Sequence, residues 1–97
     1  MAGTSEGYKV YFFYLPGCSH CEAQEPFNKK LESEYPSINI TRQDATTPAG
    51  IALLHEMLSE RGIEEEPDFP ITIFENQVFG GWESEETTGR AITEALN

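Results

Sequence analysis

Two cysteines, Cys18 and Cys21, stand three positions apart and are the only cysteines in the chain, with His20 between them. This spacing fits three interpretations: a redox-active dithiol, part of a metal site, or two small buried packing residues. The turn Pro16-Gly17 comes directly before the pair and ends the apolar run Val10-Tyr11-Phe12-Phe13-Tyr14. Cysteines placed between a buried strand and a helix favour the redox interpretation.

The predicted start of a helix at the pair gives the two thiols different roles. Free backbone N–H groups and the positive end of the helix dipole favour a thiolate at Cys18. Cys21 lies one turn further along and is expected to be less exposed. We therefore expect Cys18 to exchange with a partner's disulfide and Cys21 to resolve the mixed disulfide. His20, as a cation or a hydrogen-bond donor, is expected to stabilise the Cys18 thiolate.

The metal interpretation needs four suitable ligands, and the Cys/His set contains only four residues: Cys18, His20, Cys21 and His55. Adjacent His20 and Cys21 cannot easily point at one centre, and His55 belongs to a distant predicted helix. We therefore predict no metal site and expect His55 to be a partly buried helix residue.

Glu25 lies one turn beyond Cys21 and could in principle accept its proton. We expect instead that Glu25 is a solvated residue of the helix surface, at the spacing from Lys29 that permits an ion pair.

The hydrophobic pattern predicts a strand over 8–14, a helix over 19–34 and a second strand over 37–43. It then predicts a helix from a Thr47 cap to about Arg61, a hairpin of "FPITIFEN" and "QVFGG", and a last helix capped by Ser84. The helix that begins at Thr47 is expected to face the core with Ile51, Leu53, Leu54, Met57 and Leu58. The last helix is expected to face it with Thr88, Ala91, Ile92, Ala95 and Leu96. This order implies two parallel strands joined by a right-handed crossover, with antiparallel additions.

Composition limits the other function classes. A chain of 97 residues is expected to form one domain over 1–97, with 1–7 as a flexible tail. The net charge of −11, with six scattered Lys and Arg residues, argues against nucleic acid and anionic membranes and favours partners with neutral or basic docking patches. We expect a monomer. No signal peptide is visible, so we expect a cytoplasmic protein if the chain is complete and an extracytoplasmic one if it is cut from a longer chain.

Residues 8–96 resemble the thioredoxin superfamily in its small, glutaredoxin-sized form. The resemblance is carried by five motifs: Tyr11-Phe12-Phe13-Tyr14, Cys18-Ser19-His20-Cys21, Pro26, Phe69-Pro70-Ile71-Thr72 and Gly80-Gly81. It implies an α/β fold of order β-α-β-α-β-β-α, with a four-stranded mixed sheet of strand order 2-1-3-4 and helices on both faces. It also implies a cis Pro70 facing the cysteines, and a substrate site that includes Phe69, Pro70, Pro16 and Gly17.

The function that this resemblance implies is a thiol–disulfide oxidoreductase in an electron-transport role, without a bound cofactor. Its partners would be a protein or small-molecule disulfide and an electron donor or acceptor. A histidine before the second cysteine is similar to the disulfide-oxidising and isomerising members. Phe12 stands where thioredoxins carry a buried carboxylate, so the usual proton acceptor of the resolving cysteine is missing.

Two alternatives remain open. A glutathione-dependent glutaredoxin would need basic groups for the carboxylates of glutathione, and Lys9 and Arg42 are the nearest candidates. Trp82 and Glu83, after the paired glycines, fit that pattern in part, and Trp82 could be either a groove wall or a packing residue. The other alternative is a redox-inactive module that binds a peptide beside Phe69-Pro70.

Overall fold

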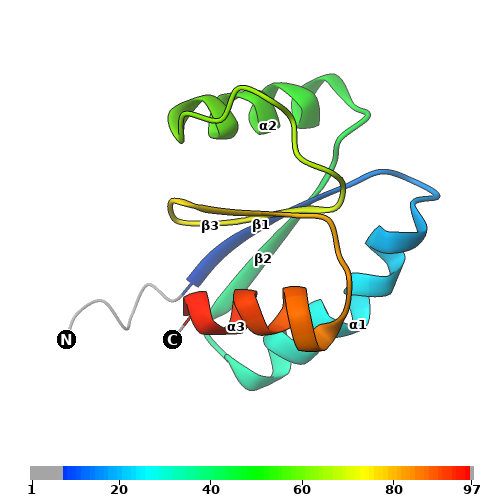
Figure 1. Ribbon diagram of the computed structural model, residues 1–97, viewed down its shortest axis with the longest axis vertical. Coiled ribbons are helices and arrows are strands. Elements are labelled where there is room, and N and C mark those ends of the chain that lie inside the picture. Colours follow the sequence, from blue (N-terminus) through cyan, green and yellow to red (C-terminus); the bar gives the residue numbers. More distant parts are fainter. Residues whose placement is uncertain (1–7, 97) are drawn as a thin grey trace.

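The computed structural model describes residues 8–96, and the predicted tail over 1–7 lies outside these described residues. The elements follow one another in the predicted order (Figure 1). They are β1 (Tyr8–Tyr14), α1 (Ser19–Glu34), β2 (Ile38–Asp44), α2 (Pro48–Glu60), β3 (Ile71–Phe74), β4 (Gln77–Gly80), the π-helical turn η2 (Glu85–Gly89) and α3 (Arg90–Leu96).

The four strands form one mixed sheet in the order β2-β1-β3-β4, which confirms the predicted arrangement. β1 pairs in parallel with β2, from Tyr8 opposite Ile38 to Tyr14 opposite Asp44. β3 is antiparallel to both of its neighbours, β1 and β4. α2 lies on one face of the sheet, and α1 and α3 lie on the other (Figure 1). The fold is thus a sheet between two helical layers, as expected.

Alternation along β1 divides the core into two layers, because successive side chains of a strand point to opposite faces. Val10 and Phe12 pack with residues of α1 and α3, whereas Phe13 packs with residues of α2. All three side chains are at most 2% exposed. β1 is therefore an interior strand of the sheet, buried on both faces, and its last residue determines where the cysteine segment leaves the sheet.

The first turn of α2 differs from the sequence prediction. Ile51 was expected to face the core but is 38% exposed, and Gly50 is the buried residue of this turn. A Cβ atom at Gly50 would overlap the carbonyl group of Asp44. The helix begins this close to the end of β2 only because Gly50 has no side chain. The Thr47 cap is as predicted: its Oγ1 accepts a hydrogen bond from the Gly50 N–H at 3.0 Å.

This contact gives a testable prediction. Gly50→Ala should lower the free energy of unfolding by about 2–3 kcal/mol, because the new methyl group meets backbone atoms that have no room to move aside. Ser59→Ala, on the exposed surface of the same helix, should change it by less than about 0.5 kcal/mol. Urea unfolding followed by circular dichroism measures both. An unfolding free energy for Gly50→Ala equal to that of the parent chain would contradict the close approach.

The C-terminal helix also differs from prediction. Ser84 is its cap, as expected, but the first turn is a π turn rather than an α turn. A π turn holds an additional residue, which rotates every later position around the helix axis. Ala91, predicted to face inward, is exposed, and Gly89 is buried instead, where a Cβ atom would lie 3.1 Å from the ring of Phe27. Ile92 and Leu96 are buried, as predicted.

Candidate redox site

Cys18 occupies the N-cap of α1, immediately after the turn that follows β1. Gly17 has a φ of +79°, a conformation that glycine adopts without strain, and the Cys18 N–H donates to the Leu15 carbonyl at 3.1 Å. The Cys21 N–H donates to Cys18 Sγ, with a nitrogen–sulfur distance of 3.2 Å. The sulfur therefore takes the place of the capping oxygen that a serine or aspartate usually supplies.

Cys21, one turn into the helix, is the buried partner. It is only 3% exposed, whereas Cys18 is half-buried, and both thiols are free. Burial, together with a hydrogen bond between the two cysteine side chains, raises the pKa of the Cys21 thiol to about 11. The difference in exposure expected from the sequence is confirmed.

The raised pKa of Cys21 predicts selective alkylation. At pH 8, a thiol whose pKa is about 11 is ionised to only about one part in a thousand, and the thiolate is the form that reacts. Iodoacetamide at pH 8 should therefore modify Cys18 and leave Cys21 free in the folded, reduced chain. Peptide mapping by mass spectrometry identifies the modified residue, and the chain unfolded in urea should be modified at both. Equal labelling of the two cysteines in the folded chain would contradict the assignment.

A groove of about 760 Å³ lies beside Cys18. It is formed by the segment before α1, the segment before β3 and the segment after β4. The residues that line it are Leu15, Cys18, His20, Asp68, Phe69, Gly80, Gly81, Trp82, Glu83 and Thr88. Of the sequence-predicted site residues, Cys18, His20 and Phe69 are thus brought together here.

Pro16 and Gly17, which were also predicted to bind substrate, are not among the residues that line this groove. They are exposed and line an adjoining pocket of about 300 Å³ together with Cys21, Glu25 and Arg42. Leu15 lines both the pocket and the groove, and Gly17 directly precedes Cys18, so the two hollows lie next to each other.

The Phe69–Pro70 peptide bond is cis, and the Pro70 side chain is buried. The Gly81 N–H donates to the carbonyl groups of Asp68, at 2.9 Å, and of Pro70, at 2.8 Å. Within residues 8–96, the backbone N–H and C=O of Phe69, between these two acceptors, have no hydrogen-bond partner. The groove therefore offers one unpaired backbone unit at the position where an extended peptide could pair with it.

Trp82 contributes both to the groove and to the core. Its ring is tilted against the ring of Phe27, with 5.2 Å between the centroids, and it also lines the groove beside Cys18. The two interpretations that the sequence left open are thus both correct. Because Trp82 is the only tryptophan in the chain, its fluorescence can report changes in this groove.

Glu25 does not pair with Lys29, although the i,i+4 spacing had suggested that pair, and its side chain is partly exposed on the surface of α1. It forms a bidentate ion pair with Arg42 of β2, with nitrogen–oxygen distances of 2.9 and 3.0 Å, and Arg42 also binds Glu32 at 3.0 Å. Arg42 faces Phe12 across the sheet register, so the pair joins α1 to the middle of β2. The register of β1 and β2 places the Arg42 guanidinium closer to Glu25 than the Lys29 ammonium group is. Local spacing in the sequence cannot reveal this register.

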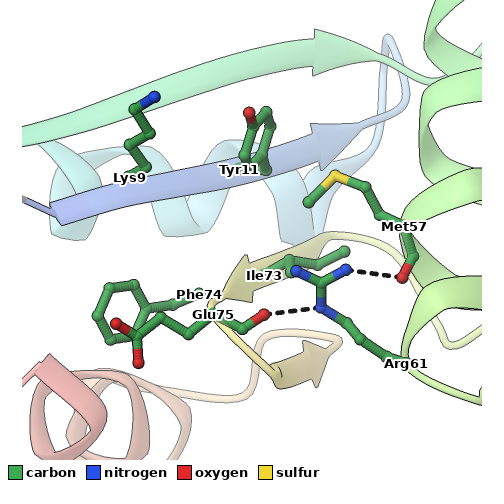
Figure 2. Close-up of a pocket in the computed structure, with 7 residues that line it drawn as sticks. All are labelled: Lys9, Tyr11, Met57, Arg61, Ile73, Phe74 and Glu75. Carbon is green, nitrogen blue, oxygen red and sulfur yellow. Dashed lines mark hydrogen bonds between the residues drawn. The ribbon is translucent and has the colours of Figure 1, made fainter.

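The two basic residues considered for glutathione lie away from the groove. Arg42 is held by two carboxylates, and Lys9 lines a different pocket, of about 340 Å³, with Tyr11, Met57, Arg61, Ile73, Phe74 and Glu75 (Figure 2). In that pocket, Arg61 donates to the backbone carbonyls of Glu75, at 2.7 Å, and Met57, at 2.8 Å (Figure 2). The pocket that Lys9 lines shares no residue with the groove beside Cys18.

His55 does not join the cysteines. Its side chain is 65% exposed on α2, where its Nε2 lies 3.9 Å from a carboxylate oxygen of Glu66, so the prediction that it is partly buried is wrong. Across residues 8–96 no group of His, Cys, Asp and Glu side chains is arranged to hold a metal ion. The same residues contain no helix that is long and apolar enough to cross a membrane.

A buried polar group between α1 and β3 was missed by the sequence reasoning. Gln24, which is fully buried, donates from Nε2 to Thr72 Oγ1 at 2.9 Å and to Asn28 Oδ1 at 3.2 Å. It ties the helix that carries Cys21 to the strand that follows Pro70. The available signal was the absence of charge at Gln24 and Asn28 in an otherwise charged helix, at the i,i+4 spacing of one face.

No protein-family model matches the chain, and no curated protein matches its sequence, but solved structures match its fold. Thioredoxin O1 from Arabidopsis thaliana in the oxidised state is 20% identical, with a TM-score of 0.60 and coverage of 95% of this chain and 79% of that one. A glutaredoxin from Archaeoglobus fulgidus is 13% identical, with a TM-score of 0.57 and coverage of 92% and 91%. A chain of the complex between ferredoxin:thioredoxin reductase and thioredoxin f2 is 17% identical, with a TM-score of 0.64 and coverage of 98% and 83%. The chain therefore has the thioredoxin-like fold.

Proposed function

We propose that the protein is a thiol–disulfide oxidoreductase that uses the Cys18–Cys21 pair. The observation that carries this proposal is the asymmetry of the two thiols: Cys18 caps α1 at the edge of a groove, and buried Cys21 contacts it from one turn further in. Cys18 lines the groove, where a partner can reach its sulfur, whereas Cys21 is only 3% exposed and does not line that groove.

The reaction proceeds by two exchanges. The Cys18 thiolate attacks one sulfur of a substrate disulfide; a bond forms between Cys18 and that sulfur, and the other substrate sulfur leaves as a thiolate that takes a proton from water. Cys21 then loses its proton to solvent and attacks Cys18, releasing the second substrate thiol. The protein ends as a disulfide, oxidised by two electrons, and the substrate ends as two thiols. The reverse sequence oxidises a substrate dithiol, and the potential of the compartment chooses the direction.

His20 supports the first exchange. It is exposed at the rim of the groove and, among the described residues, makes no hydrogen bond with Cys18, so its contribution is electrostatic rather than geometric. A positive charge beside the sulfur stabilises the thiolate relative to the thiol. The backbone N–H and C=O of Phe69 pair with the peptide that carries the substrate disulfide.

The direct experiment mixes the reduced protein with a stoichiometric amount of 2-hydroxyethyl disulfide. Two equivalents of 2-mercaptoethanol should be released for each protein chain, and the protein should become 2 Da lighter as the disulfide forms. A redox-inactive peptide-binding module would release 2-mercaptoethanol no faster than an unstructured peptide that contains cysteine. That result would overturn the proposed function.

A further inference from the structure

The groove beside Cys18 is lined by two carboxylates and by no Lys or Arg side chain. Asp68 and Glu83 are the carboxylates among its lining residues, and both are exposed. In the part of the chain that the structure describes, neither forms an ion pair. No Lys or Arg residue lines the groove, so His20 is the only lining residue that can become positive.

Several basic side chains that could offset these carboxylates are engaged elsewhere. Arg42 binds Glu25 and Glu32, Lys30 binds Glu85 at 2.7 Å, and Arg61 donates to two backbone carbonyls. The chain as a whole has a net charge of −11. An anionic ligand entering the groove would meet two carboxylates without a fixed positive charge to compensate them.

Both carboxylates are placed by fixed backbone. Asp68 directly precedes Phe69, and its carbonyl group is held by the Gly81 N–H at 2.9 Å. Glu83 is fixed by its own N–H, which donates to Thr88 Oγ1 at 3.1 Å. A peptide that paired with the free backbone of Phe69 would pass beside Asp68, so the residues next to its cysteine would lie within reach of these carboxylates.

We propose that this groove selects peptide disulfides whose cysteines are flanked by Lys or Arg, and discriminates against those flanked by acidic residues. The proposal rests on the proposed function, because the selection acts on the exchange at Cys18. Asp68 and Glu83 are specificity-determining residues that attract the substrate and do not take part in bond formation.

The test compares three peptide disulfides that differ only in charge: the disulfide-linked dimers of acetyl-Lys-Cys-Lys-amide, acetyl-Gln-Cys-Gln-amide and acetyl-Glu-Cys-Glu-amide. Trp82 fluorescence follows the reaction of reduced protein with each. Every rate is divided by the rate of the same peptide with dithiothreitol, because flanking charge also changes intrinsic reactivity. At low ionic strength the Lys dimer should react about tenfold faster than the Gln dimer, and the Glu dimer slower still. In 0.5 M salt the differences should shrink to about twofold.

A pair of double variants separates the groove from the overall charge. Asp68→Asn with Glu83→Gln should lower the Lys-to-Gln rate ratio at least threefold. Glu56→Gln with Glu94→Gln removes the same charge from exposed helix positions outside the groove and should leave the ratio unchanged. Equal effects of the two double variants, or a Lys-to-Gln ratio near one in the parent chain, would overturn the selectivity. Reaction with the Gln dimer would still support the proposed function, and failure to react with any dimer would overturn both.

Discussion

Cys18→Ala is expected to reduce disulfide exchange to the rate of the solution without protein. The variant loses the only thiol that borders the groove, and Cys21, only 3% exposed with a pKa raised to about 11, cannot replace it. For an attacking group that is removed entirely, the loss should be on the order of a thousandfold or more. Release of 2-mercaptoethanol from 2-hydroxyethyl disulfide, measured at pH 8 with equal protein concentrations, gives the ratio.

Its control is Ser19→Ala, at the exposed neighbouring position, which leaves both sulfur atoms in place. This variant should keep the parent rate within about a factor of two. Circular dichroism should show that Cys18→Ala remains folded, since a half-buried thiol contributes little to the core. Exchange by the folded Cys18→Ala chain at more than a tenth of the parent rate would contradict the assignment of Cys18 as the nucleophile.

Cys21→Ser is expected to complete the first exchange with the substrate disulfide but not the second. Cys18 can still form the mixed disulfide, but the sulfur that would displace the partner from within the molecule is absent. Intramolecular attack by a positioned group corresponds to a very high effective concentration, so the lifetime of the mixed disulfide should rise on the order of a thousandfold or more. Mass spectrometry after reaction with 2-hydroxyethyl disulfide should show one mercaptoethanol adduct, located on Cys18.

The parent chain treated in the same way should show no lasting adduct and should instead be 2 Da lighter. Cys21→Ala serves as a second variant that adds no polar group to the buried site. If both Cys21 variants released two equivalents of 2-mercaptoethanol without added thiol, resolution by Cys21 would be wrong.

Local signals were sufficient to predict the elements and their order. The Tyr, Phe and Val residues of 8–14 gave a central strand, Pro16-Gly17 gave its end, and Thr47-Pro48 gave the start of α2. The observed bounds of α1, Ser19–Glu34, coincide with the prediction, and β2 is shifted by one residue from it. These features depend on neighbouring residues, so the sequence contains them directly.

The errors arose where residues distant in sequence decide the outcome. Ile51 fits the helical stripe of α2, yet Gly50 faces the sheet because the chain passes close to Asp44. The π turn moved Ala91 out of the core, and no propensity rule indicates such a turn.

The site residues were likewise predictable only where the signal is local. The helix start identified Cys18 and Cys21, because their environment is local. The partner of Glu25 depended on the register that brings Arg42 beside it. Asp68 was not singled out, since only the folded chain places it on the same groove as Cys18.

The central claim is that Cys18 and Cys21 form one reversible redox couple. Its most direct test equilibrates the protein in buffers of reduced and oxidised dithiothreitol over a range of ratios, quenches with acid and maps the cysteine peptides by mass spectrometry. A two-electron transition between the dithiol and an intramolecular Cys18–Cys21 disulfide, followed in parallel by Trp82 fluorescence, is the predicted result. Thiols that stay reduced at every ratio, or that oxidise only by linking two chains, would contradict it.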